Sequence, residues 1–226
     1  MLDRSVVKAA GGLLMFGAVL GLVANLMHPQ LSDPSPREEL ELVADSGIWL
    51  IDHFLIAWTG AFLLVGLVAI GWSYAEPRAA AWGRFAIASG IVGVGILFLT
   101  ALVDGMAVKD AADAWAANPD DPAIYGRALA VMDMQRILFT GIQGSIFGLT
   151  PVLFGVAGLM TDEHPKWLAW LVLVAGVVGL LSGSIQYLAG VSRLTADVLF
   201  PIASIAFTAW AFIMGLRLWK GSPAQA

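Results

Sequence analysis

Six blocks of apolar residues, each longer than about 18 residues, constrain the fold of this chain more than any other feature. Each block is long enough to cross the hydrocarbon core of a bilayer as a helix. Charged residues make up only 13% of the chain, whereas soluble domains carry about 25%. The sequence therefore predicts an all-α, polytopic membrane protein with spans at roughly 8–28, 48–74, 82–107, 129–160, 167–188 and 195–218.

The first block is expected to be a retained helix rather than a signal peptide. Its apolar stretch from Ala9 to Met27 exceeds the about 7–15 residues of a signal-peptide core, and no A-x-A cleavage site follows it. The chain has no cysteine, which excludes disulfides and thiolate metal sites.

The distribution of charge predicts the orientation in the membrane. Seven of the 12 Lys and Arg residues lie at the termini and in the 75–84 and 161–166 loops, and 13 of the 17 acidic residues lie on the opposite side. Because cytoplasmic loops carry an excess of Lys and Arg, we predict a multi-pass plasma-membrane protein with both termini in the cytoplasm. Its acidic outer face argues against nucleic acid as a partner, and the lipid bilayer is its expected environment.

Two decapeptides suggest internal repetition. IDHFLIAWTG (51–60) and MDMQRILFTG (132–141) share Asp, Ile, Thr and Gly at matching positions. We therefore predict one transmembrane domain over 1–226 made of three helical hairpins, the first two forming a parallel repeat. These hairpins would occupy 8–74, 82–160 and 167–218.

The connections on the outer side are predicted to form short amphipathic helices. SPRE (35–38) is a capping box with Pro36 at the first helical position, and opens a helix through Ala44. A second helix is expected over 107–117, ending at Asn118-Pro119. Their apolar stripes, which either dock a partner or are buried against the bundle, are Leu40/Val43 and Val108/Ala111/Ala112/Trp115.

Small residues and prolines predict how the spans pack and bend. Glycine pairs spaced by four residues allow close approach of helix backbones within a bilayer, and prolines inside a span kink it. The pairs are Gly17/Gly21, Gly144/Gly148 and Gly179/Gly183, and the prolines are Pro151 and Pro201.

Polar side chains gather near the outer ends of the spans. An ionisable group at the centre of a span costs about 2.5–3.5 kcal/mol, so this gathering predicts a shared ligand site in the outer leaflet. A structural alternative is that Asp52 and Asp133 interact with helix N-termini and that Arg136 neutralises a carboxylate. The candidate ligand-binding residues are His28, Asp52, His53, Trp58, Asp104, Asp133, Arg136, Gln143 and Gln186.

One hypothesis for this site is a divalent metal such as zinc, copper or iron, held by His28, His53 and Asp104. Asp52 and His53 are consecutive, so they should diverge by about 100° on a helix and not face one ion together. Haem is less favoured, because both histidines lie near the membrane interface. A metal-dependent membrane enzyme would use His53 as general base, with carboxylate partners and with Arg136 facing an anion. The sequence identifies no reaction.

A second hypothesis is a pocket for a lipid, a quinone or another amphipathic molecule. Trp58 would line its apolar floor, whereas Trp49 and Trp115 are assigned to the interfacial aromatic belt. A third hypothesis is a non-catalytic accessory subunit of a larger membrane complex.

One sequence pattern also resembles known proteins. The pattern MHP…W-x-x-D-H-x-x-x-x-x-x-G, followed by ALVDGMA at 101–107, resembles a loose group of small uncharacterised prokaryotic six-helix membrane proteins over about residues 10–110. The resemblance implies a six-helix fold and carries over no activity and no catalytic residues.

Overall fold

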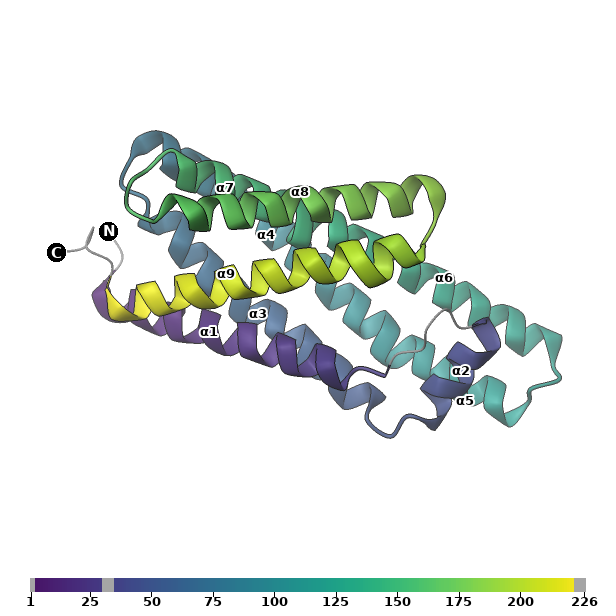
Figure 1. Cartoon of the computed structure of the whole chain (residues 1–226). Coiled ribbons are helices and arrows are strands. Elements are labelled where there is room, and N and C mark those ends of the chain that lie inside the picture. Colours follow the sequence, from purple (N-terminus) through teal and green to yellow (C-terminus); the bar gives the residue numbers. More distant parts are fainter. Residues whose placement is uncertain (1–2, 30–34, 222–226) are drawn as a thin grey trace.

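The computed structural model describes residues 3–29 and 35–221, which form helices and no strand. Six continuous helical segments are long and apolar enough to cross a membrane (Figure 1), as the sequence predicted. They are α1 (Arg4–Met27), α3 (Trp49–Ser73), α4 to α5 (Pro77–Ala117), α6 to α7 (Pro122–Leu159), α8 (Lys166–Ala189) and η3 to α9 (Leu194–Lys220).

Two of the spans begin earlier than hydropathy indicated, because proline and an acidic cap start each helix. Pro77 follows Glu76, whose side chain accepts the N–H of Ala79 at 2.6 Å. Pro122 follows Asp121, which caps α6 in the same way. Proline suits the first helical position, where its missing N–H would have no helical partner.

The third and fourth segments are longer than a membrane requires. The 41 residues of Pro77–Ala117 extend about 60 Å as a helix, against about 30 Å for the hydrocarbon core. The helix predicted over 107–117 is therefore the continuation of the third span: α4 (Pro77–Leu102) passes through a π-helical turn, η1 (Val103–Val108), into α5 (Lys109–Ala117).

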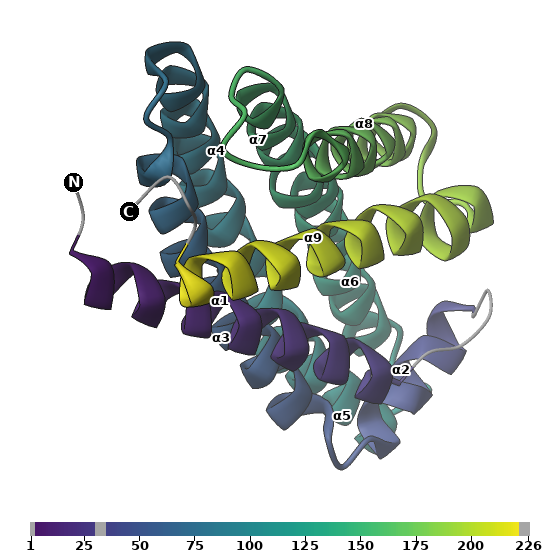
Figure 2. The same ribbon diagram turned by 60° about the vertical axis from the view of Figure 1, so that its left-hand side comes forward.

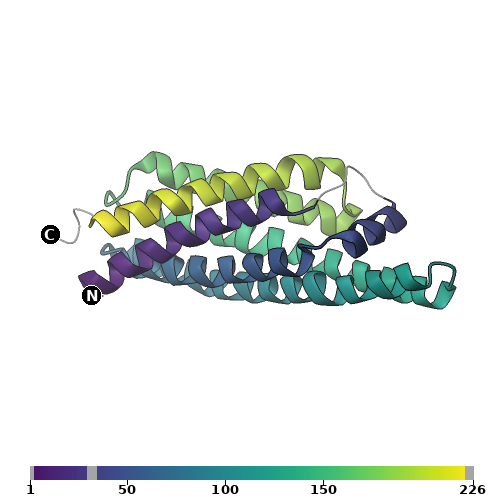
Figure 3. The same cartoon turned by 90° about the horizontal axis from the view of Figure 1, so that it is seen from below.

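The projecting part forms a small helical bundle of its own. It consists of α2 (Pro36–Asp45), α5 and the first half of α6 (Pro122–Gly144), and we call it the head. The capping box at the start of α2 is confirmed: Glu38 N–H donates to Ser35 Oγ at 3.3 Å, and Ser35 N–H donates to Glu38 Oε2 at 2.7 Å. Figure 3 shows α2 lying beside this projecting end.

The head has its own apolar core. The two stripes predicted on the short helices pack there against each other and against α6. Trp115 is buried in this core rather than placed in an aromatic belt, because α2 and α6 cover it, and Arg37 stacks over Trp115 and Tyr125. Since the stripes are covered by the chain itself, they offer no docking surface. The core residues are Leu40, Val43, Trp49, Val108, Ala112, Trp115, Ala128 and Met132.

The spans form a closed bundle. Each span packs against its neighbours in sequence, and α1 packs against α9, which completes the ring (Figure 2). Because α3 contacts α4 as well as α1, the contacts do not single out three pairs. The division into hairpins and the repeat therefore stay predictions.

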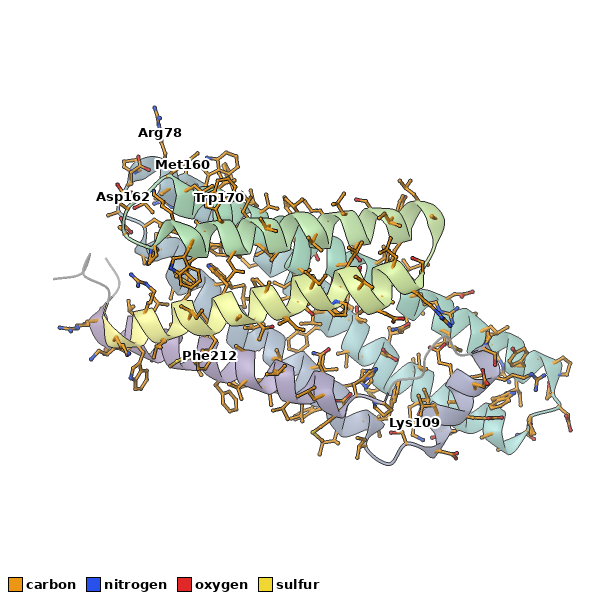
Figure 4. The ribbon with its side chains drawn as sticks, in the orientation of Figure 1. Arg78, Lys109, Met160, Asp162, Trp170 and Phe212 are labelled. Atoms are coloured by element: carbon orange, nitrogen blue, oxygen red, sulfur yellow. The ribbon has the colours of Figure 1, made fainter. Side chains whose placement is uncertain are left out.

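The two ends of the bundle differ in what they contain. The described ends of the chain lie together with the α3–α4 and α7–α8 loops, and we call this the terminal end. Figure 4 places Arg78, Met160 and Asp162 there, and Lys109 at the opposite, head end. In the head, Lys109 Nζ donates to the carbonyl of Ala44 at 3.0 Å, which ties α5 to α2.

Glycine and proline shape the spans largely as predicted. A Cβ added at Gly179 would lie 2.1 Å from the carbonyl oxygen of Phe147, and one at Gly17 would lie 3.1 Å from the backbone N of Leu63. Such contacts confirm that these glycines allow close backbone approach. Before Pro151 and Pro201 the chain forms π-helical turns, η2 (Ser145–Leu149) and η3 (Leu194–Leu199). A widened turn relieves the clash between a proline ring and the preceding carbonyl groups.

Candidate metal site

The predicted polar residues meet most closely where the end of α1, the start of α3 and the turn η1 come together. His28 is the C-cap of α1, because Pro29 follows it and disfavours further helix. Its backbone N–H still donates to Ala24 at 2.9 Å. This placement brings His28 Nδ1 to 2.7 Å from Oδ2 of Asp52, on the first turn of α3.

Asp52 is the most unusual group of the site. Its side chain is fully buried, yet its Oδ1 has no hydrogen-bond partner among the residues that the structure describes. A buried polar atom left without a partner costs about 1–3 kcal/mol, and more when it is charged. A cation bound at Oδ1 would remove this cost.

His53 presents two nitrogens to two acceptors. Nδ1 lies 2.8 Å from the carbonyl oxygen of Trp49, which can only accept, so Nδ1 carries a hydrogen. Nε2 lies 3.2 Å from Oδ2 of Asp104. In neutral His53 this Nε2 holds a lone pair, so it would face a carboxylate with no hydrogen between them. The pair therefore requires a positive charge, either a proton or a metal ion.

Asp104 is held in place by the π-helical turn and by two neighbours. Its Oδ2 accepts a hydrogen bond from Gln135 Nε2 at 2.9 Å, and its backbone carbonyl accepts one from the indole N–H of Trp49 at 2.8 Å. Gly105 lets this turn lie against α3, since an added Cβ would lie 2.6 Å from His53 Cβ. Asp104 thus reaches His53 because residue 105 has no side chain.

Trp49 belongs to the site, and its assignment to the aromatic belt is wrong. It is buried because the head covers the start of α3. Its ring centroid lies 5.1 Å from that of His28 and 4.7 Å from that of His53, while its own carbonyl and indole N–H orient His53 and Asp104. The sequence carried one signal for this role: Trp49 is one helical turn before His53.

Three potential metal ligands converge despite their positions on the helix. One ligand atom from each of His28, Asp52 and His53 lies within 4.8 Å of the other two. The expectation that consecutive residues could not face one ion is therefore wrong here. The angle applies to the Cα–Cβ bonds, whereas the side-chain atoms beyond Cβ bend back toward the end of α1.

Two predicted site residues lie outside this cluster. Asp133 is 70% exposed and pairs with Arg136 at 3.3 Å, and Arg136 also reaches Glu39 of α2 at 3.1 Å. Burial raises the pKa of Glu39, and the charge of Arg136 partly opposes that rise. This ion-pair group links α2 to α6, and no pattern in the sequence indicated Glu39 as a partner.

The remaining predicted residues also lie elsewhere. Trp58 is 46% exposed and contacts the rings of Phe54 and Phe62, at centroid distances of 6.1 and 6.0 Å. It faces outward from the bundle, where lipid would surround it. Gln143 and Gln186 are buried in a second polar cluster on α6 and α8.

The geometry also bears on haem. The rings of His28 and His53 pack edge to face, with centroids 5.1 Å apart. A porphyrin plane does not fit between two rings in direct contact.

No family model, curated protein or solved structure matches this chain. Function is therefore inferred from the chemistry of the site.

Proposed function

We propose that this integral membrane protein binds a divalent transition metal at the junction of α1, α3 and η1. One observation carries the proposal: the buried Asp52 carboxylate has an oxygen with no partner among the described residues, and it lies beside two histidines, with ligand atoms of the three residues within 4.8 Å of one another. Imidazole nitrogens and carboxylate oxygens are the donors that zinc and non-haem iron(II) use in proteins.

The ligands would be His28, Asp52 and His53; Asp104 lies outside this converging group but contacts His53, and its side chain would complete the set as a fourth ligand. Tetrahedral zinc with ligands at 2.0–2.1 Å places neighbouring ligand atoms about 3.3 Å apart. His53 Nε2 and Asp104 Oδ2 already lie 3.2 Å apart. His28 Nδ1 and Asp52 Oδ2 are closer, at 2.7 Å, so this hydrogen bond opens when both bind the metal.

The groups around these ligands match what metal sites require. A histidine ligand usually donates its second N–H to a carbonyl or carboxylate, which fixes the nitrogen that binds. The carbonyl of Trp49 accepts from His53 Nδ1, and Gln135 donates to Asp104. These contacts favour a metal over the amphipathic ligand that was the alternative for the same residues.

The proposed location of the site follows from charge and from the position of the head. The residues next to it belong to the acidic side of the chain, which we propose faces away from the cytoplasm of the plasma membrane. An acidic surface raises the local concentration of cations. The site would then take its metal from the non-cytoplasmic side.

Metal analysis of the purified protein tests the proposal. The whole chain, purified in mild detergent and dialysed against Zn²⁺ or, without oxygen, Fe²⁺, should retain about one ion per chain. Asp52→Asn and His53→Gln should weaken binding by about a hundredfold or more, because each removes a direct ligand. Asp133→Asn is the matched control, since this exposed carboxylate lies at the same end outside the cluster.

Three outcomes would overturn the proposal. The first is a wild-type chain that retains neither ion, and the second is loss of metal from Asp133→Asn equal to that from Asp52→Asn. The third is an Asp104→Asn variant that elutes as folded protein and binds metal as tightly as wild type. Circular dichroism and size exclusion establish folding for each variant, so that unfolded material is not scored.

A further inference from the structure

A second polar cluster lies between α6, α8 and η3, and its hydrogen bonds in the described part of the chain join hydroxyl, amide and backbone groups. Ser182 Oγ lies 2.5 Å from Gln143 Oε1 and 3.1 Å from the carbonyl oxygen of Thr195. Thr140 Oγ1 lies 3.3 Å from Gln186 Oε1 and 3.0 Å from the carbonyl oxygen of Arg136. Both glutamines are more than nine-tenths buried, with 0% and 4% exposure.

The hydrogens available in this cluster do not satisfy it. Ser182 has a single hydroxyl hydrogen, and Gln143 Nε2 has no partner in the described part of the chain. If the amide of Gln143 is turned so that Nε2 donates to Ser182, then Ser182 satisfies the carbonyl of Thr195, but Gln143 Oε1 loses its donor. Either orientation leaves one amide atom of Gln143 without a partner.

Gln186 repeats the same pattern one helical turn away on α8. Its Nε2 also lacks a partner among the described residues, and Thr140 has one hydrogen for two acceptors. Turning this amide again exchanges an unpartnered N–H for an unpartnered carbonyl. Two buried amides therefore each retain one free hydrogen-bonding position, which acts as donor or acceptor according to what binds there.

Aromatic side chains stand next to this cluster. Phe139 and Phe147 lie four residues before and after Gln143, so the three share one side of the segment. The ring of Phe200 lies 5.0 Å from that of Phe139 and 5.3 Å from that of Phe147. An apolar or aromatic molecule whose polar end reached the amides would pack against these rings.

The backbone beside Gln143 is open on one side. A Cβ added at Gly144 would meet no atom within 4 Å, whereas one at Gly183 would lie 2.8 Å from the backbone N of Gly144. Gly144 thus combines tight packing of α6 on α8 with open space at the position of its missing side chain. Gln143 is the preceding residue, so a molecule dissolved in the bilayer would approach the cluster from this side.

We propose that this cluster binds the polar end of a neutral amphipathic molecule with carbonyl or hydroxyl oxygens on an apolar body, of which a quinone is one chemical example. Neutrality follows from the hydroxyl and amide side chains that make up the described part of the cluster, because burial of an unpaired charge is costly. The amides supply donors to a carbonyl, or acceptors to a hydroxyl. The site is separate from the proposed metal site and does not depend on it.

Binding of a short-chain quinone tests this proposal. Equilibrium dialysis of the full chain in detergent should show saturable binding of decyl-benzoquinone, and only non-saturable partitioning of decylbenzene, which lacks the oxygens. Gln143→Leu and Gln186→Leu should each weaken quinone binding by about fivefold or more, since each removes a hydrogen bond. Gly144→Leu should also weaken it, by filling the open space.

Tyr187→Phe is the matched control, because Tyr187 is next to Gln186 in sequence but exposed; its quinone affinity should equal that of wild type. Metal content should stay unchanged in all these variants, which separates this proposal from the preceding one. The proposal is overturned if the quinone and decylbenzene behave alike, or if both leucine variants fold and bind quinone as wild type does. Either result would assign the free amide positions to internal water.

Discussion

The two ends of the bundle each bury a histidine, but they surround it in opposite ways. At the head end, His53 has an acceptor at each nitrogen and lies beside His28 and Asp52. At the terminal end, neither nitrogen of His164 has a partner within the described ranges, and its ring packs edge to face against Tyr74. Burial of a titratable group alone does not make a cation site. The charge of the neighbouring side chains determines whether a buried histidine can take part in such a site.

The electrostatics of the terminal end disfavour positive charge. Burial and the nearby Arg217 lower the pKa of His164 to about 4. Burial, together with Glu163, raises the pKa of Tyr74, so both rings stay neutral at pH 7. Glu163 also accepts the backbone N–H of Ala75 at 2.9 Å, which ties the α7–α8 loop to the α3–α4 loop. This end therefore acts as a structural junction, whereas the head end gathers carboxylates around its histidines.

The largest effect expected to test this contrast comes from Trp49. Trp49→Ala should lower the free energy of unfolding by about 3–5 kcal/mol, because it removes a buried aromatic ring. It should also weaken metal binding by about 10–100-fold, since Trp49 orients both His53 and Asp104. Denaturation in detergent and metal titration measure the two effects.

Trp58→Ala is the control for this prediction. Trp58 lies on the same helix but faces outward, so its removal should change stability by less than about 1 kcal/mol and leave metal affinity as it is. Equal losses in the two variants would contradict the distinction between a built site at the head end and the lipid-facing surface.

A smaller effect is expected at the terminal end, and it depends on pH. The pKa of His164 is depressed in the folded protein, so between pH 6.5 and about 4 the unfolded chain binds the proton more readily. Stability from this group is therefore present above pH 6.5 and is lost as the pH falls toward 4, by up to about 3 kcal/mol. Melting temperatures measured across this pH range should show the loss.

His164→Phe removes the titrating group while keeping a ring against Tyr74. The variant should lose less stability than wild type on acidification and should keep its metal. An unchanged pH dependence would show that His164 is already solvated. Loss of metal would show that the cation site lies at the terminal end and not at the head end.

The smallest effect is expected from Arg136. Its pairs with Glu39 and Asp133 are partly exposed, and such pairs contribute about 0–1 kcal/mol. Arg136→Gln should therefore lower stability by less than about 1 kcal/mol without changing the metal affinity. A large loss of metal would instead show that Arg136 belongs to the functional site, as the sequence analysis predicted.

The structure brings the central residues of the predicted set together and separates the others from them, while binding of a ligand by the central residues stays a prediction. Hydropathy and helix length place His28, Asp52, His53 and Asp104 at one level, which is why these four residues could be found together. The same reasoning placed Asp133, Arg136, Gln143 and Gln186 with them, because depth along a span is readable from sequence. Rotation about the helix axis is not readable in this way when apolar residues surround the helix on all sides.

The sequence by itself determined that the chain is helical, that it has six spans, and where α2 begins. Apolar block length and capping residues are local properties, so they need no knowledge of neighbouring helices. Only the tertiary structure decided that the third span continues into the head, that Trp49 is buried, and that the polar residues divide into an ionisable cluster and an amide cluster. These features depend on which helix faces meet, and close packing across the whole bundle sets those contacts.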